Sequence, residues 1–319
     1  MPRKKIGVAL GGGTMRGMTH IGILEVLEEN NFPIHFLVGC SSGAIVAAAY
    51  ACGKLKELKE TAILLKNKDR RKMLDLSFSG GGLIKGKQLR SLFDFLTDGK
   101  KFEDIEGLKL AFVGTDALAG NEVVIDSGSI AEALEITTAL PGLAPIKRYR
   151  GRLVFDGGTA MLVPARIAYN LGAEKVIGVD VSVGRSVITR AVGDFRKMMR
   201  KSTLRRVFNP VFKMGDKALN GGEEKFFGAV KSLMRKLKLL DDYEKHRFNF
   251  FEAYLIGLRA ISADYKKGLF LDDDCDIAIR PDVLHFRRSD VSQAKMMIEE
   301  GRKAAEDKME EIRGLLTKN

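Results

Sequence analysis

Continuous apolar runs alternate along the chain with segments whose apolar residues recur at the spacing of one helix face. The first run, 6–10, ends in three glycines, and the apolar residues of 22–27 after it have helical spacing. We predict strands at 6–10, 36–38, 109–114, 122–125, 152–155, 175–181 and 276–279, and helices at 22–27, 44–51, 130–139, 163–171, 250–263 and 289–316, the last with Ser289 as N-cap. Strands that alternate with helices favour an α/β fold, in which a largely parallel central sheet has helices on both faces.

Basic residues are concentrated in one segment. The whole chain has a net charge of +12, and 186–240 alone contains 14 Lys and Arg against 4 Asp and Glu. Apolar residues recur there at helical spacing with Lys and Arg between them, and Asn209-Pro210 interrupts the pattern. We therefore predict one domain over 1–319 with a basic amphipathic helical insertion at about 186–247. Such a face either packs on its own domain or lies on an anionic membrane surface.

The composition argues against several other classes of protein. The apolar run that follows the basic start of the chain is too short for a signal peptide, and glycines and serines interrupt the uncharged stretch 36–53, so we predict neither a signal peptide nor a transmembrane helix. Three cysteines without C-x-x-C spacing indicate neither a disulfide framework nor a zinc site. With no cluster of calcium or zinc spacing, we expect no metal and no cofactor. These features favour a cytoplasmic protein with peripheral membrane contact and no nucleic-acid partner.

A serine stands at the centre of a glycine-flanked turn. Gly39-Cys40-Ser41-Ser42-Gly43 fits the pattern G-x-S-x-G, with an apolar run before it and a stretch of small residues after it. This is the strand, turn and helix context in which a strained elbow exposes a nucleophilic hydroxyl. The spacing selects Ser41 rather than Ser42, and Gly39 and Gly43 leave room where the flanking backbones come close. We interpret Cys40 as a small buried residue.

A second glycine-rich loop, 11–17, follows the first predicted strand and opens a helix, so its N–H groups are suited to binding an anion. A dinucleotide fingerprint would need glycine where Arg16 stands, and an acidic residue near position 36, where the chain has Phe36. An oxyanion hole needs only clustered N–H donors beside the nucleophile. We therefore predict an oxyanion hole, made by Gly11, Gly12, Gly13 and Thr14. Arg16 supports this loop, meets a phosphate, or pairs with a carboxylate.

A candidate base follows another predicted strand. Asp156 precedes Gly157 and Gly158 and lies 115 residues after Ser41. An Asp-Gly-Gly turn is common, but in a sheet that already carries an elbow serine it places a carboxylate where the two glycines let it approach the hydroxyl. We predict that Asp156 is the base for Ser41.

These blocks together resemble the patatin-like phospholipases, especially the bacterial ones. The resemblance rests on LGGGTMRGMTHIGIL, on VGCSSGAIVAA, and on TTALPGLAPI followed by LVFDGGTAMLVPARIAYNLGAEKVIGVDV, in family order over about 5–183. The stretch 249–290 resembles the family's ending, and 186–247 has no counterpart. The resemblance implies a three-layer patatin-like fold, a Ser-Asp dyad at Ser41 and Asp156, an oxyanion loop at 11–13, and the family's Arg-Gly pair at Arg16 and Gly17.

The family resemblance also implies that no histidine is catalytic. A Ser…Asp…His order would place a triad base at His246 or His285, and this alternative stays open. The predicted function is a serine acyl-hydrolase that cleaves lipid carboxylic esters, of phospholipase A or lysophospholipase type. Two alternatives are an acyltransferase that uses the same serine, and a non-catalytic basic module that binds an acidic partner or nucleic acid on a hydrolase scaffold. The sequence predicts no oligomeric state.

Overall fold

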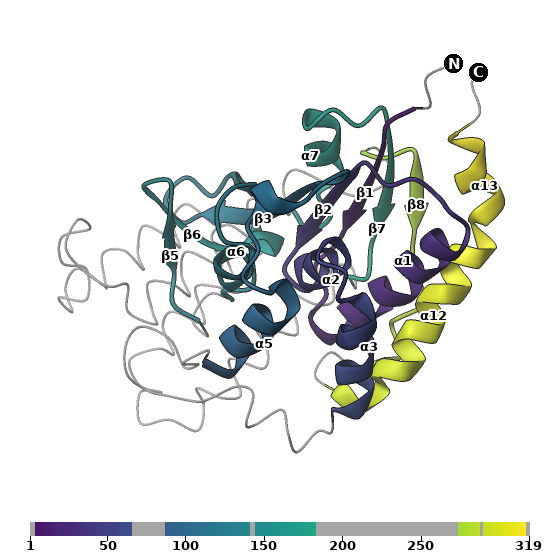
Figure 1. Ribbon diagram of the computed structural model, residues 1–319, viewed down its shortest axis with the longest axis horizontal. Coiled ribbons are helices and arrows are strands. Elements are labelled where there is room, and N and C mark those ends of the chain that lie inside the picture. Colours follow the sequence, from purple (N-terminus) through teal and green to yellow (C-terminus); the bar gives the residue numbers. More distant parts are fainter. Residues whose placement is uncertain (1–3, 66–86, 141–143, 183–273, 288–289, 317–319) are drawn as a thin grey trace, which may run out of the picture. The chain divides into compact units, whose positions relative to one another are not determined.

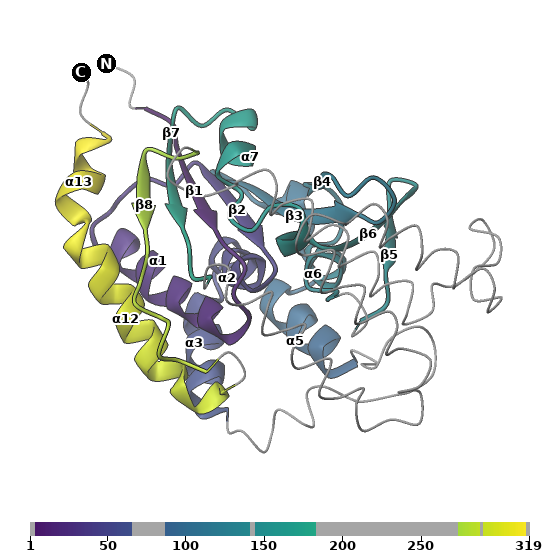
Figure 2. The ribbon, with the colours of Figure 1, turned by 180° about the vertical axis from the view of Figure 1, so that it is seen from behind.

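The computed structural model describes residues 4–65, 87–140, 144–182, 274–287 and 290–316. Within these ranges the chain forms an eight-stranded sheet in the order β5-β6-β3-β2-β1-β7-β8 (Figure 1), with β4 paired to β3 (Figure 2). The strands are β1 (Ile6–Leu10), β2 (Phe36–Cys40), β3 (Lys109–Asp116), β4 (Glu122–Ile125), β5 (Lys147–Tyr149), β6 (Arg152–Asp156), β7 (Lys175–Val179) and β8 (Ile277–Ile279).

The sheet is mixed and mostly parallel, which confirms the predicted fold class. Strands β3, β2, β1, β7 and β8 run parallel to their neighbours, whereas β4 and β6 are antiparallel to β3 and β5 is antiparallel to β6. Short turns join β3 to β4 and β5 to β6, and a short turn allows only antiparallel pairing. Because β6 runs against β3, Asp156 at its end pairs with Gly114 inside the sheet.

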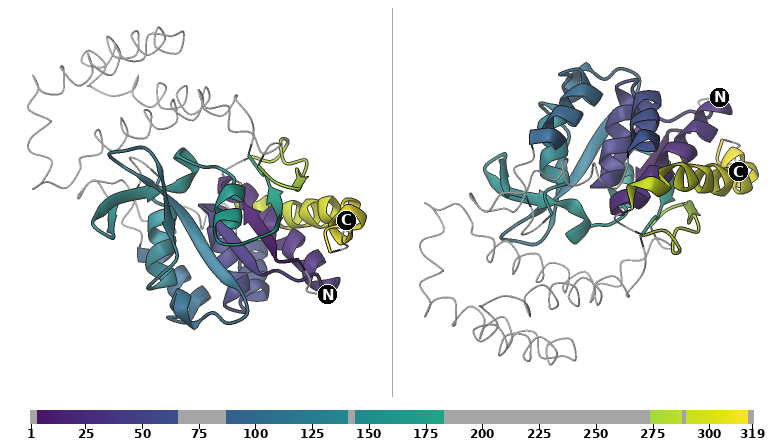
Figure 3. Two further views of the ribbon diagram at one scale, coloured as in Figure 1. Left: turned by 90° about the horizontal axis from the view of Figure 1, so that it is seen from above. Right: turned by 90° about the horizontal axis from the view of Figure 1, so that it is seen from below.

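Helices cover both faces of the sheet. They are α1 (Thr19–Glu29), α2 (Ser42–Ala51), α3 (Leu55–Leu64), α5 (Lys87–Thr97), α6 (Ile130–Thr137), α7 (Ala165–Asn170), α12 (Ala294–Asp307) and α13 (Met309–Gly314), with 3-10 turns η1 (Thr14–Met18), η2 (Phe102–Asp104), η3 (Gly157–Thr159) and η6 (Val291–Gln293). Ile6, Val8 and Leu10 belong to the core under α1 and α2, whereas Ala9 faces the core under α7. Successive side chains of this strand therefore face the two helical layers on opposite sides of the sheet, which are seen in Figures 2 and 3.

Several elements differ from the prediction. Helices α3 and α5 and strand β5 were not predicted, although Leu55, Leu58 and Ala62 of α3 are buried at helical spacing. The single helix expected at 289–316 is wrong: a 3-10 turn capped by Asp290 comes first, and the helix breaks at Lys308. Ser289, the helix expected at 250–263 and the insertion at about 186–247 lie outside the described residues. The prediction of one domain with a basic insertion therefore stays a prediction.

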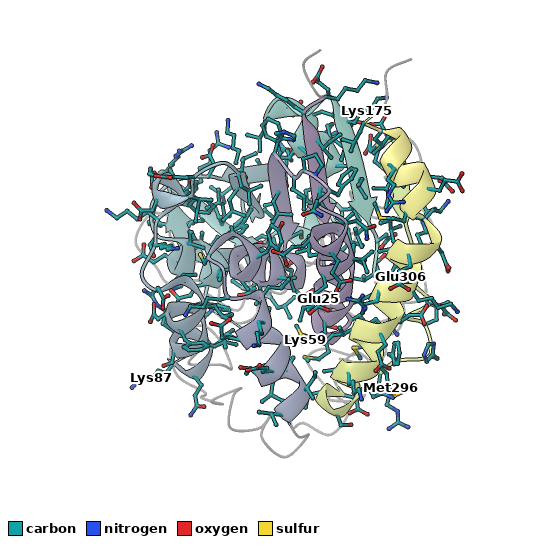
Figure 4. The ribbon with its side chains drawn as sticks, turned by 45° about the vertical axis from the view of Figure 1, so that its right-hand side comes forward. Glu25, Lys59, Lys87, Lys175, Met296 and Glu306 are labelled. Atoms are coloured by element: carbon teal, nitrogen blue, oxygen red, sulfur yellow. The ribbon has the colours of Figure 1, made fainter. Side chains whose placement is uncertain are left out.

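Helix α12 crosses α1 at two glycines. A Cβ at Gly22 would overlap the carbonyl oxygen of Ile298, and one at Gly301 would overlap that of Thr19, so the two backbones touch. Arg302 of α12 donates to Glu29 at 2.6 Å. Figure 4 shows Glu25 of α1 and Lys59 of α3 pointing toward one another, and they pair at 2.8 Å. The 294–307 segment is thereby fixed onto the helix that follows the first glycine-rich loop.

Across the part of the chain that the structure describes, no helix has both the length and the apolar content that a bilayer span requires.

Candidate active site

The serine turn joins β2 directly to α2. Ser41 has φ 51° and ψ −119°, a conformation that strains a residue with a side chain. The strand before it runs through Cys40, which is fully buried. A Cβ at Gly39 would overlap the backbone of Ala44, and one at Gly43 would overlap the carbonyl of Leu10. Glycines at these two positions therefore allow β1, β2 and α2 to pack closely around the sharp turn at Ser41.

Ser41 and Asp156 are in direct contact. Ser41 Oγ donates to Asp156 Oδ2 at 2.7 Å, and the N–H of Gly158 donates to Oδ1 at 2.8 Å. Asp156 is only 3% exposed. Burial raises the pKa of Asp156 to about 6, while the hydrogen bonds from Ser41 and Gly158 act in the opposite direction. A carboxylate with this pKa is ionised at neutral pH and can take the hydroxyl proton.

The glycine loop lies beside this pair, but its N–H groups already have partners. Gly11 donates to the carbonyl of Val179 at 3.0 Å and Gly12 to that of Leu162 at 3.0 Å. Gly13 donates to Ser42 Oγ at 2.9 Å. The N–H groups of Gly11, Gly12 and Gly13 are therefore all engaged in hydrogen bonds within the protein.

The remaining loop residues have different surroundings. Thr14 is exposed, and its hydroxyl donates to the carbonyl of Gly13 at 2.6 Å. Arg16 is buried and donates to the carbonyls of Phe286, at 2.7 and 3.2 Å, and of Leu284, at 3.2 Å. Gly17 packs against Ser42, where a Cβ would overlap its side chain. Among the roles left open for Arg16, these contacts are those of a residue that supports the loop.

No described histidine forms a hydrogen bond with Ser41 or Asp156. His20 is fully buried, its Nε2 lies 2.7 Å from the carbonyl of Gly11, and burial lowers its pKa to about 4. His35 Nδ1 accepts from the N–H of Ile6 at 3.0 Å. His285 is exposed beside Asp282, 3.8 Å away. His246 lies outside the described residues. Over the same residues, no group of three or more His, Cys, Asp and Glu could hold a metal ion.

Sequence reasoning missed several residues that touch the site. Ser42 entered the sequence analysis only as the neighbour of the predicted nucleophile, and Leu162 was not considered. Thr137, whose Oγ1 accepts the Ser41 N–H at 3.1 Å, was quoted only as part of TTALPGLAPI. The available indication was that Thr137 shares the buried face of α6 with Ile130 and Leu134, because buried hydroxyls need hydrogen-bond partners.

The chain is similar to members of one family. The family model described as Patatin-like phospholipase matches residues 8–169, which include Ser41 and Asp156. An uncharacterized NTE family protein of Mycobacterium tuberculosis is 31% identical over 180 residues, covering 56% of this chain and 49% of the relative. Patatin-like phospholipase domain-containing protein 6 of Homo sapiens is 30% identical over 182 residues, covering 55% of this chain and 13% of the relative. The match thus spans about half of the first relative and a small part of the second.

A solved structure, VipD from Legionella pneumophila, aligns with 64% of this chain and 55% of its own chain at 15% identity and a TM-score of 0.34. This likeness is too weak to support an argument.

Proposed function

Because the chain belongs to the patatin-like phospholipase family, we propose that it is a serine acyl-hydrolase that cleaves carboxylic esters of lipids, of phospholipase A or lysophospholipase type. The observation that carries the proposal is the 2.7 Å hydrogen bond from Ser41 Oγ to a buried aspartate, made by a serine in a strained elbow. A nucleophile within hydrogen-bond reach of its base is the arrangement that acyl transfer to serine requires.

In the proposed mechanism, Asp156 accepts the Ser41 proton while Oγ attacks the ester carbonyl. The carbonyl oxygen becomes an oxyanion, the alcohol leaves with a proton returned by Asp156, and the acyl group stays on Ser41. A water molecule then attacks the acyl-enzyme with Asp156 again as base, and the fatty acid is released. The site needs no metal or cofactor for these steps.

We assign oxyanion stabilisation to the glycine loop, at Gly11, Gly12, Gly13 and Thr14. The amides of Gly12 and Gly13 are bound to Leu162 O and Ser42 Oγ. Acyl entry therefore has to displace at least one of these acceptors, so that its N–H turns to the substrate oxygen. Leu162, whose carbonyl holds the Gly12 N–H, is 38% exposed.

The proposal also includes contact with an anionic membrane through 186–240, residues that lie outside the described ranges. The segment's charge supports it, because each Lys or Arg near an anionic surface contributes about 1 kcal/mol. Sedimentation with vesicles of phosphatidylglycerol and phosphatidylcholine tests it: binding should rise with phosphatidylglycerol, weaken with salt, and fall when Arg205, Arg206, Lys231, Arg235 and Lys236 become Gln. Equal binding to neutral vesicles would reject membrane contact by charge and leave the dyad proposal intact.

A fluorophosphonate probe tests the dyad proposal. It should label the wild type, and not Ser41→Ala, at a serine that is also required for fatty-acid release from lysophosphatidylcholine. Equal labelling of wild type and Ser41→Ala would place the reactive serine elsewhere. No labelling and no release by the folded wild type would favour the non-catalytic alternative.

A further inference from the structure

Strand β3 lies between the strand that carries the nucleophile and the strand that carries the base. It pairs with β2 on one side, where Val113 is the partner of Cys40, and with β6 on the other, where Gly114 is the partner of Asp156. The strands β2 and β6 therefore do not pair with each other. The separation of Ser41 and Asp156 depends on how each is attached to β3.

Thr137 attaches the nucleophile to β3. It ends α6, is fully buried, and lies 96 residues from Ser41 in sequence. Its Oγ1 accepts the backbone N–H of Ser41 at 3.1 Å and donates to the carbonyl of Val113 at 2.6 Å. One hydroxyl thus bridges the strained elbow residue to the middle strand, using its donor and an acceptor position together.

Thr115 attaches the base to β3 in a similar way. It is fully buried, its Oγ1 donates to the backbone carbonyl of Asp156 at 2.8 Å, and it accepts the N–H of Ala160 at 3.2 Å. The two bonds span the turn that contains Gly158, whose N–H orients the Asp156 carboxylate. A Cβ at Gly157 would overlap the Val113 carbonyl, so the carbonyl that anchors Thr137 also borders this turn.

We propose that Thr137 and Thr115 are positioning residues, which set the Ser41–Asp156 geometry by fixing each partner to β3 through a buried hydroxyl. The proposal rests on the proposed function, since it assigns these hydroxyls to the same dyad. It requires that the hydroxyl, and not the volume of the side chain, be the part that matters. A valine of equal shape would leave the Ser41 N–H and the Val113 carbonyl without these partners, and would remove this side-chain link between the elbow and the middle strand.

Two other threonines provide matched controls. Thr97 is fully buried, and its hydroxyl donates to the carbonyl of Phe93 at 2.9 Å within α5. Thr138 is the immediate neighbour of Thr137, and its hydroxyl donates to the carbonyl of Leu134 at 2.7 Å. Each of these two hydroxyls donates to a carbonyl four residues earlier in its own helix, Thr97 in α5 and Thr138 at the end of α6. Replacing them removes a threonine hydroxyl without touching the dyad.

The experiment compares Thr137→Val and Thr115→Val with Thr97→Val and Thr138→Val, by the rate of fluorophosphonate labelling and by kcat and KM on a short-chain ester. We expect the first two variants to lose roughly 10- to 100-fold in labelling rate and kcat, the scale of a misplaced reacting group, with KM little changed. The controls should keep the wild-type rate, whatever their melting temperatures. Thr137→Ser and Thr115→Ser should restore most of the rate, because serine keeps the hydroxyl.

If a valine variant fails to fold, the pair Thr137→Ser and Thr137→Ala replaces it, since these differ only in the hydroxyl. Equal rates for that pair, or wild-type rates in folded Thr137→Val and Thr115→Val, would overturn the inference. So would losses in Thr97→Val as large as those at the two sites. Absence of labelling in the wild type would instead reject the proposed function, which separates the two failures.

Discussion

Ser41 and Asp156 share a 2.7 Å hydrogen bond although the strand β3 lies between the strands that carry them. The contact is possible because β6 runs antiparallel to β3 and brings Asp156 level with Gly114, one position beyond the partner of Cys40. Within the described residues no third titratable group bonds to either of them, so the proton has one acceptor.

The first prediction is that Ser41→Ala and Asp156→Asn each reduce ester hydrolysis by at least about 10³-fold while the far-ultraviolet circular dichroism spectrum stays unchanged, because a dyad has no third member to compensate. Hydrolysis of a p-nitrophenyl ester measures the loss. His285→Ala, which changes an exposed residue, is the control and should retain activity, as should His246→Ala. Near wild-type turnover in Asp156→Asn would remove Asp156 from the dyad, and a serine-like loss in either histidine variant would support a triad.

A second prediction concerns the pH dependence of activity. Burial raises the pKa of Asp156 to about 6, and only the ionised carboxylate can accept the Ser41 proton. The value of kcat/KM should be flat above pH 7 and fall about tenfold per pH unit well below pH 6. A profile that stays flat to pH 4 in the folded protein would contradict this assignment of the base.

A third prediction concerns stability. The pKa of Asp156 is about 6 in the fold against 3.8 for the unperturbed group, so the folded state binds this proton more tightly. The contribution of this pKa difference to the free energy of unfolding is fully present below pH 3.8 and is lost as the pH rises through 6. The loss amounts to at most about 3 kcal/mol. Asp156→Asn carries no such cost. Relative to wild type, its melting temperature should therefore rise between pH 4 and pH 8, and a constant difference over that range would contradict the prediction.

A fourth prediction tests the glycine loop. The backbone of Gly13 is extended, but a Cβ there would lie 2.6 Å from Cγ2 of Val181, so Gly13→Val must shift the loop. Turnover should fall by about 10²-fold, the cost of losing one oxyanion donor, while KM changes little, because the donor acts in the transition state. Adding Val181→Ala to Gly13→Ala should recover part of the rate. Unchanged turnover in folded Gly13→Val would place the oxyanion hole elsewhere.

A fifth prediction tests the crossing of α1 and α12. Gly22→Ala and Gly301→Ala each add a Cβ where the other helix's backbone stands, and each should lower the free energy of unfolding by on the order of 3 kcal/mol. Gly314→Ala is the matched control: it meets open space in α13 and should leave stability unchanged or raise it by up to about 1 kcal/mol. Thermal unfolding measures all three, and equal melting temperatures would contradict the close packing.

The parts of the fold that the sequence predicted are those with uniform local patterns. Strands such as Ile6–Leu10 and Glu122–Ile125 agree with the prediction residue for residue, because apolar runs bounded by turn residues define them. The antiparallel direction of β6 could not be predicted, since it depends on pairing with β3 across distant residues. The break at Lys308 carries no glycine or proline to mark it.

In the candidate site, too, residues in local motifs could be predicted and contacts with distant residues could not. Ser41 and Asp156 stand in motifs whose local geometry is encoded by neighbouring glycines, so both could be named from the sequence. The hydrogen-bond partners of the Gly12 and Gly13 N–H groups could not be predicted. The Gly12 N–H bonds to the carbonyl of Leu162, which is distant in sequence, and the Gly13 N–H bonds to the Ser42 hydroxyl, whose position depends on a side-chain rotamer. Thr115 gave no indication at all, because a threonine in a strand is common.

The crossing of α1 and α12 also bears on the order in which the fold forms during synthesis. Arg302 and Glu29 are separated by 273 residues, so α1 lacks this packing partner until almost the entire described chain has left the ribosome. Ser41 and Asp156 emerge much earlier, while the side of α1 that packs against α12 is still uncovered. Long-range closure of this kind is slow to form. We therefore expect a nascent chain stopped before residue 294 to contain the dyad and yet show no esterase activity.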